Sequence, residues 1–176
     1  MPTVGFVSHP AFLEHDTGAG HPERPARLSA ILKHLQTTDL WARLKRHEPK
    51  PADPATLELV HPRIYIEQIH ATCRHGPTAL DPDTVASPGS WEAALRAVGA
   101  VTEAIDHVMA ATWQGAFCAV RPPGHHALAT RAMGRPDRDS SPVSSTSKDC
   151  PASNPANRRM EVPELPRYSG PGGGLR

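Results

Sequence analysis

The chain is poor in the cysteine patterns that mark disulfide-stabilised proteins and metal-binding knuckles. It has 176 residues and three cysteines, Cys73, Cys118 and Cys150, with no C-x-x-C pair. An odd number of widely spaced cysteines argues against a disulfide framework and against a structural zinc knuckle. We therefore expect a protein of a reducing, cytoplasmic compartment.

The chain also lacks an excess of charge and a long apolar run. Its 19 basic and 18 acidic residues leave a net charge of +1, and no basic stripe of the kind used by nucleic-acid-binding proteins is evident. No apolar stretch is long enough to span a bilayer, and no signal peptide is recognisable at the N-terminus. We expect neither direct nucleic-acid binding nor a membrane partner.

What the chain does contain is an alternation of strand-like and helix-like segments. In one of them, from Pro25 onward, apolar residues recur at the spacing of a packed helical face: Leu28, Ile31, Leu32 and Leu35. The patterns predict strands at 3–7 and 116–120, helices at 25–35, 39–44, 53–60 and 90–109, a further partly apolar segment at 62–73, and a loop at 75–89. This alternation predicts an α/β layered domain.

The composition changes after residue 134. Residues 135–176 contain no Ile and no Phe and are dominated by Ser, Pro, Arg and Gly. Such a segment buries too little apolar surface to offset the entropy lost on ordering. We predict two parts: an α/β domain at 1–134 and a low-complexity, disordered tail at 135–176.

A pair of histidines follows the predicted strand 116–120, in the run from Arg121 to Ala127. Two prolines before Gly124 stiffen the chain, and we expect the glycine to free it to turn. Ligands bind beyond the carboxyl ends of strands in an open α/β sheet, and histidines exchange protons near neutral pH. The pattern predicts a proton-handling site at His125 and His126. The alternative is an exposed loop with two incidental histidines.

Metal ligands are a second possibility in the loop before residue 25. His21 and Glu23 are side chains that suit zinc, but the loop has no regular ligand spacing. We favour a polar loop packed beneath the site. A less favoured alternative is a self-contained hydrolase that places a metal among His21, Glu23, His125 and His126.

The histidine run resembles the catalytic histidine-pair motif of the zinc-dependent histone deacetylase superfamily, which includes acetoin-utilisation and acetylpolyamine amidohydrolase proteins. Residues 21–28 and 87–94 resemble further signatures of this superfamily, in the same order along the chain. The resemblance covers residues 3–134. It implies the N-terminal part of a three-layer α/β fold with an open parallel sheet, of the arginase/deacetylase type.

The resemblance implies roles for individual residues. His126 would be the general base that takes a proton from a zinc-bound water, and His125 would support the oxyanion and the leaving amine. Arg27 matches an arginine of an internal product channel, although a helix-surface charge is the plainer interpretation. Gly124 belongs to the substrate channel. An aspartate that meets the substrate backbone would be Asp83 or its neighbour Asp81, or a merely solvated loop residue.

The zinc ligands of the family are missing from this sequence. They come from an Asp-x-His motif and a later aspartate, whereas this chain has no Asp-x-His and all eleven of its histidines precede residue 127. Zinc is thus expected for the family, but no metal ligand can be assigned here. The break after Gly134 suggests a frameshift, a premature stop or a misassembled gene.

Two functions remain. The first is a histone-deacetylase-like amidohydrolase that removes acetyl groups from acetylated lysine or polyamine, with this chain an incomplete and inactive fragment. The alternative is a non-catalytic α/β fragment or partner-binding module.

Overall fold

The computed structural model describes residues 3–133, which are built around a three-stranded parallel sheet. The strand order is β2 (Leu44–His47), β1 (Val4–Val7) and β5 (Gly115–Cys118). Val4 pairs with Leu44 on one side and with Gly115 on the other, so β1 is the central strand. The predicted tail, 135–176, lies outside the described residues.

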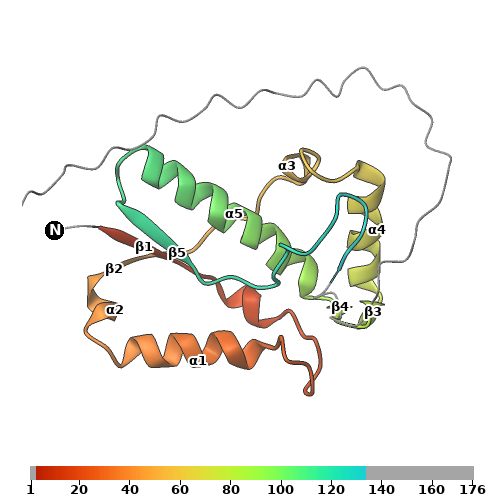
Figure 1. Ribbon diagram of the computed structural model, residues 1–176, viewed down its shortest axis with the longest axis horizontal. Coiled ribbons are helices and arrows are strands. Elements are labelled where there is room, and N and C mark those ends of the chain that lie inside the picture. Colours follow the sequence, from red (N-terminus) through yellow and green to blue (C-terminus); the bar gives the residue numbers. More distant parts are fainter. Residues whose placement is uncertain (1–2, 134–176) are drawn as a thin grey trace, which may run out of the picture. The chain divides into compact units, whose positions relative to one another are not determined.

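Helices cover both faces of this sheet (Figure 1). The long helix α5 (Ser90–Met109) lies on one face and α1 (Pro25–Gln36) on the other. Small buried residues of α5, Ala93, Ala100 and Ala104, let the helix approach the sheet closely. The remaining elements are the 3-10 helix η1 (Pro10–Leu13), helices α2 (Leu40–Arg43), α3 (Pro54–Leu57) and α4 (Arg63–Arg74), and strands β3 (Thr78–Asp81) and β4 (Thr84–Ala86).

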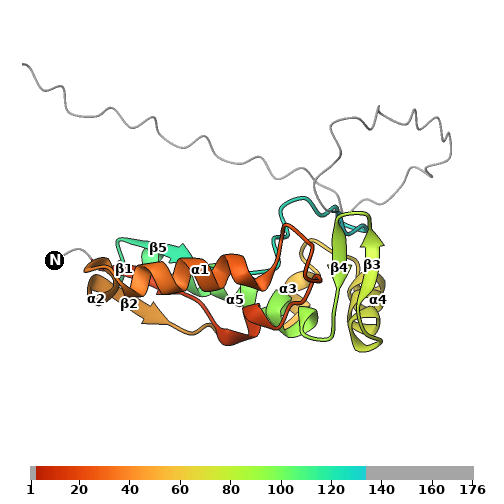
Figure 2. The same cartoon turned by 90° about the horizontal axis from the view of Figure 1, so that it is seen from below.

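The α/β class with a parallel sheet agrees with the sequence prediction, and three strands were missed. Strand β2 begins at Leu44, where a helix was expected to end. It was missed because Lys45 and Arg46 are exposed and leave this edge strand without an apolar run. The predicted loop at 75–89 contains the antiparallel pair of β3 and β4, which lies beside α4 in Figure 2. None of the helices within residues 3–133 is long and apolar enough to cross a bilayer.

Parallel strands bring their carboxyl ends to one edge of the sheet. At this edge the chain leaving β5 is tied to the chain leaving β1: the Ala119 amide donates to the Val7 carbonyl at 2.8 Å, and Ser8 Oγ donates to the Ala119 carbonyl at 3.1 Å. These bonds extend the pairing beyond the strand ends. The histidine run therefore starts from the sheet edge where ligands bind in open α/β folds.

Candidate functional site at the histidine loop

The histidine loop, residues 121–127, presents two imidazole rings side by side. The ring centroids of His125 and His126 lie 4.2 Å apart, with the ring planes inclined by 51°. His125 is exposed and His126 is half-buried. The Ala127 amide donates to the Gly124 carbonyl at 3.0 Å and closes the turn that carries them. Two adjacent imidazoles near solvent are suited to general acid–base chemistry.

Arg121, at the start of the loop, is buried and anchored. Its side chain is 4% exposed. Its Nε donates to Glu23 Oε1 at 2.5 Å and one terminal nitrogen donates to Oε2 at 2.8 Å, while the other donates to the Phe12 carbonyl at 2.8 Å. A bidentate pair of this kind fixes orientation as well as distance. The loop is therefore held to the segment that precedes α1.

Glu23 stays ionised in this contact. Burial alone would raise its pKa, but hydrogen bonds from His15 and Arg121, together with the charges of these two residues, outweigh burial and lower the pKa from 4.5 to about 2. The carboxylate is thus a permanent counter-charge for Arg121 at neutral pH. Both carboxylate oxygens accept hydrogen bonds from Arg121.

His15 extends the contact to the start of α5. Its Nε2 lies 3.5 Å from Glu23 Oε2, and its Nδ1 lies 2.7 Å from Ser90 Oγ. Ser90 Oγ also accepts from the Ser87 amide at 2.8 Å, and Ser87 Oγ accepts from the Asp16 amide at 2.9 Å. The sequence motifs at 21–28, 87–94 and 121–127 therefore meet in one largely buried polar network.

The two candidate channel aspartates lie at the turn between β3 and β4. The Asp83 amide donates to Asp81 Oδ1 at 2.8 Å. His21 Nε2 lies 3.3 Å from Asp83 Oδ1, so a protonated His21 forms an ion pair with this aspartate. The first motif thus contacts the hairpin as well as Arg121.

The structure shows few contacts for the other two candidate channel residues, Arg27 and Gly124. Arg27 lies in the first turn of α1 with an exposed side chain, and no hydrogen bond or ion pair joins that side chain to another residue within 3–133. Gly124 does not have the positive φ that would require glycine, and an added Cβ would meet nothing within 4 Å. The backbone therefore turns at Gly124 without a conformation that only glycine adopts.

The described residues do not fit the zinc ion that the family resemblance implies. Between residues 3 and 133 no group of three or more His, Cys, Asp or Glu side chains is arranged to hold a metal. Glu23, one of the candidate ligands, has both oxygens engaged by Arg121. A metal shared by His21, Glu23 and the histidine pair therefore has no support in this geometry.

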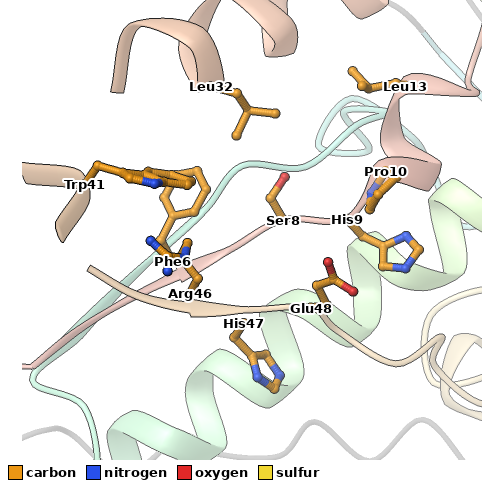
Figure 3. Close-up of a pocket in the computed structure, with 10 residues that line it drawn as sticks. All are labelled: Phe6, Ser8, His9, Pro10, Leu13, Leu32, Trp41, Arg46, His47 and Glu48. Atoms are coloured by element: carbon orange, nitrogen blue, oxygen red, sulfur yellow. The ribbon is translucent and has the colours of Figure 1, made fainter. Parts of the chain in front are cut away.

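A separate hollow of about 470 Å³ lies near the β2 side of the sheet and is lined by residues of β1, β2, η1, α1 and α2 (Figure 3). Two of its polar side chains, Arg46 and His47, contact partners within the protein. The Arg46 guanidinium lies 5.0 Å from the centre of the Trp41 ring, and His47 Nε2 lies 2.6 Å from Glu103 Oε2. Because Phe6, Leu13, Leu32 and Trp41 form much of the lining, the hollow offers mainly apolar wall to a ligand.

Comparisons with known proteins match the part of the chain that contains the three motifs. The histone deacetylase domain matches residues 21–135 of this chain. A histone deacetylase-like amidohydrolase of Pseudomonas aeruginosa is 36% identical over 134 residues, covering 76% of this chain, and histone deacetylase 8 of Arabidopsis thaliana is 34% identical over 126 residues, covering 71%. The chain belongs to the histone deacetylase domain family.

A solved structure supports the fold. The crystal structure of the HDA15 HD domain superposes with a TM-score of 0.71 at 27% sequence identity, over 76% of this chain. The matched region is only part of each relative. This chain spans 34% of the Pseudomonas protein, 33% of the Arabidopsis protein and 40% of the HDA15 chain.

Sequence reasoning found the histidine pair and missed the residues that anchor it. His15 and the partner of Arg121 were not predicted, because Glu23 and Arg121 are 98 residues apart and no local pattern joins them. The one available signal was that both belong to motifs of the same family. Ser90, the first residue of α5, uses its hydroxyl in the network with His15 and Ser87.

Proposed function

We propose that this chain carries the proton-handling part of a histone-deacetylase-like amidohydrolase that acts on acetylated lysine or acetylated polyamine. The observation that supports this function best is the side-by-side pair His125 and His126 on a loop anchored through Arg121 and Glu23. The pair lies within the region matched by the family. The nucleophile in this reaction class is water.

In the proposed reaction, water adds to the acetyl carbonyl, the amide C–N bond breaks, and acetate and a free amine leave. His126, the more buried of the two, takes the proton from the attacking water, and that proton passes to the departing amine. His125, 4.2 Å away, stabilises the charge on the carbonyl oxygen and the amine. Such proton transfer contributes about 10²–10⁴ to the rate.

Three further residues would guide substrate and product. Asp83, next to His21, would accept a hydrogen bond from the substrate backbone. Arg27 would meet the acetate product, and Gly124 would leave room for the acyl chain because nothing lies within 4 Å of an added Cβ. We place the reaction in the cytoplasm.

A chimera tests the histidine roles. Residues 3–133 of this chain would replace the matched 134 residues of the Pseudomonas aeruginosa amidohydrolase, and turnover of an acetyl-lysine peptide would be measured. We expect turnover that falls by about 100-fold or more in His126→Ala. His75→Ala, an exposed histidine outside the loop, is the matched control. A folded chimera whose His126→Ala variant keeps full activity would rule out the proposed general base.

We expect a different result for the isolated chain. Because residues 3–133 do not fit the zinc ion of the family, we expect the purified 176-residue chain to show no measurable deacetylation. Robust turnover that disappears in His126→Ala would contradict this expectation. A partner-binding role is the second candidate, and the outer edge of β5, which has no strand beside it within residues 3–133, favours it.

A further inference from the structure

The chain at the end of β2 sends its side chains alternately to the two faces of the sheet. His47 turns toward α5, where its Nε2 lies 2.6 Å from Glu103 Oε2. Its neighbours Arg46 and Glu48 turn the other way, because successive side chains of an extended chain point to opposite faces. Figure 3 shows the His47 ring on one side of the chain and the Glu48 carboxylate on the other. Arg46 and Glu48 thus border the same hollow.

The guanidinium of Arg46 is held in place without being neutralised. It lies 5.0 Å from the centre of the Trp41 ring, which contacts the Phe6 ring edge to face at 5.6 Å between centroids. A guanidinium is attracted to an aromatic face, and this contact leaves its N–H groups available as donors. No ion pair joins Arg46 to a carboxylate within residues 3–133. Arg46 is therefore a positioned cation at the rim of the hollow.

The other end of the hollow carries hydrogen-bond acceptors. Val7 pairs with His47 in the parallel register, so the next residues along, Ser8 and Glu48, are neighbours at the carboxyl ends of β1 and β2. Ser8 Oγ donates its hydrogen to the Ala119 carbonyl at 3.1 Å, which leaves its lone pairs free to accept. The Glu48 side chain is exposed and forms no ion pair in the part of the chain that the structure describes.

The wall between these two ends is largely apolar. Phe6 and Leu32 line it, and the hollow encloses about 470 Å³. Sites for small molecules have volumes of this order and combine apolar walls with a few polar groups that fix the orientation of the ligand. The hollow also lies at the carboxyl ends of parallel strands, where open α/β sheets bind ligands.

We propose that this hollow binds a free α-amino acid with an apolar side chain. The Arg46 guanidinium donates to the carboxylate of the ligand, and Glu48 and Ser8 accept hydrogen bonds from its ammonium group. The apolar side chain of the ligand packs against Leu32 and Trp41.

The argument for an amino acid is charge complementarity. The rim carries one cation and one anion that have no ion-pair partners within residues 3–133, and a zwitterion supplies an opposite charge to each. A ligand with a single charge would satisfy one of them and leave the other without a partner. No residue of the histidine loop lines the hollow, so the proposal is independent of the amide hydrolysis assigned to His125 and His126.

Matched ligands test this charge pattern. The purified 176-residue chain would be titrated by calorimetry with L-phenylalanine, hydrocinnamate and phenethylamine, which share the phenyl ring and differ in their charged groups. We expect saturable binding of phenylalanine at one site per chain. The affinity for each singly charged analogue should be lower by about 10-fold or more, because each analogue lacks one charge-assisted set of hydrogen bonds.

Substitutions at the rim then locate the site. Arg46→Gln and Glu48→Gln should each weaken the binding of phenylalanine by about 10-fold. In Arg46→Gln, phenylalanine should lose its advantage over phenethylamine, and in Glu48→Gln its advantage over hydrocinnamate. Lys45→Gln and Glu67→Gln remove exposed charges outside the hollow and serve as matched controls. Circular dichroism of each variant checks folding.

Four results would overturn the proposal. The first is the absence of saturable binding of phenylalanine up to its solubility limit. The second is equal affinity for all three ligands, which would show an apolar hollow without recognition of an amino acid. The third is tighter binding of a singly charged analogue. The fourth is binding that the rim variants leave unchanged, which would place phenylalanine elsewhere. None of these measurements depends on deacetylation, so failure here is distinguishable from failure of the proposed reaction.

Discussion

The two ends of the histidine loop are built in opposite ways. Arg121 at one end is buried, with three hydrogen bonds to Glu23 and Phe12. His125 and His126 at the other end lie near solvent and have each other as ring neighbours, with no hydrogen bond to either ring from another residue within 3–133. One end carries the buried hydrogen bonds and the other end carries the two imidazole rings. The loop is thus fixed at its base and available at its tip.

This difference follows from the requirements of each role. A buried guanidinium is tolerated only when its charge and its donors are satisfied. A proton carrier, by contrast, must exchange with substrate and water, so its ring cannot be fully enclosed by partners. The predictions below separate these two requirements.

Removal of the anchor should have the largest effect. Arg121→Ala leaves the Glu23 carboxylate buried without its bidentate partner and should lower the free energy of unfolding by about 4 kcal/mol. Urea denaturation followed by circular dichroism measures this. Arg63→Ala removes an exposed arginine from a surface pair with Glu67 and should leave the midpoint unchanged. Equal effects of the two variants would mean that Arg121 contributes no more to stability than an exposed arginine does.

Loss of the counter-charge should be somewhat milder and dependent on pH. Glu23→Gln should cost about 3 kcal/mol at pH 7, because Arg121 stays buried without a carboxylate. The folded-state pKa of Glu23 is lowered to about 2 from 4.5, so its stabilising contribution is present above about pH 4.5 and is lost as the pH falls toward 2.

The difference in stability between wild type and Glu23→Gln should therefore shrink across that pH interval. Urea midpoints measured in steps from pH 5 to pH 2 give the comparison. Glu92→Gln, at an exposed i, i+4 pair with Arg96, supplies the control and should show no comparable trend. A constant gap between wild type and Glu23→Gln down to pH 2 would mean that Glu23 does not titrate as the contact requires.

Changes at the tip should have the smallest effect on stability. His125→Ala and His126→Ala should each alter the free energy of unfolding by no more than about 0.5 kcal/mol, because surface residues without partners contribute little. His15→Ala, at a buried histidine bonded to Ser90, should cost more than about 1 kcal/mol. Thermal unfolding ranks the three. A large loss at His126 would show that the pair is structural rather than available for chemistry.

Local sequence patterns predicted the elements that carry strong periodicity. The stripe from Leu28 to Leu35 and the run from Ser90 to Met109 are helices in the structure. Strand β2 escaped prediction because its side chains are largely solvent-exposed, and the hairpin of β3 and β4 escaped because each strand has at most four residues. Short strands draw their stability from pairing, which a linear pattern does not show.

Some features of the candidate site were also predictable from local sequence, and others were not. The histidine pair was recognisable because adjacent residues form a compact motif at a strand end. The turn at Gly124 is made with an ordinary backbone conformation, which the sequence pattern did not specify. The anchoring role of Glu23 could not be inferred, since its partners come from other parts of the chain.

The sequence by itself determined the family, the α/β class and the position of the histidine pair, because these depend on motifs and periodicities within short stretches. The tertiary structure decided that Arg121, Glu23, His15 and Ser90 form one network, and that β2 and β5 are the edges of the parallel sheet within residues 3–133. Contacts between residues as far apart as 23 and 121 arise only when the strands and helices pack. Packing converts three separate motifs into one anchored loop.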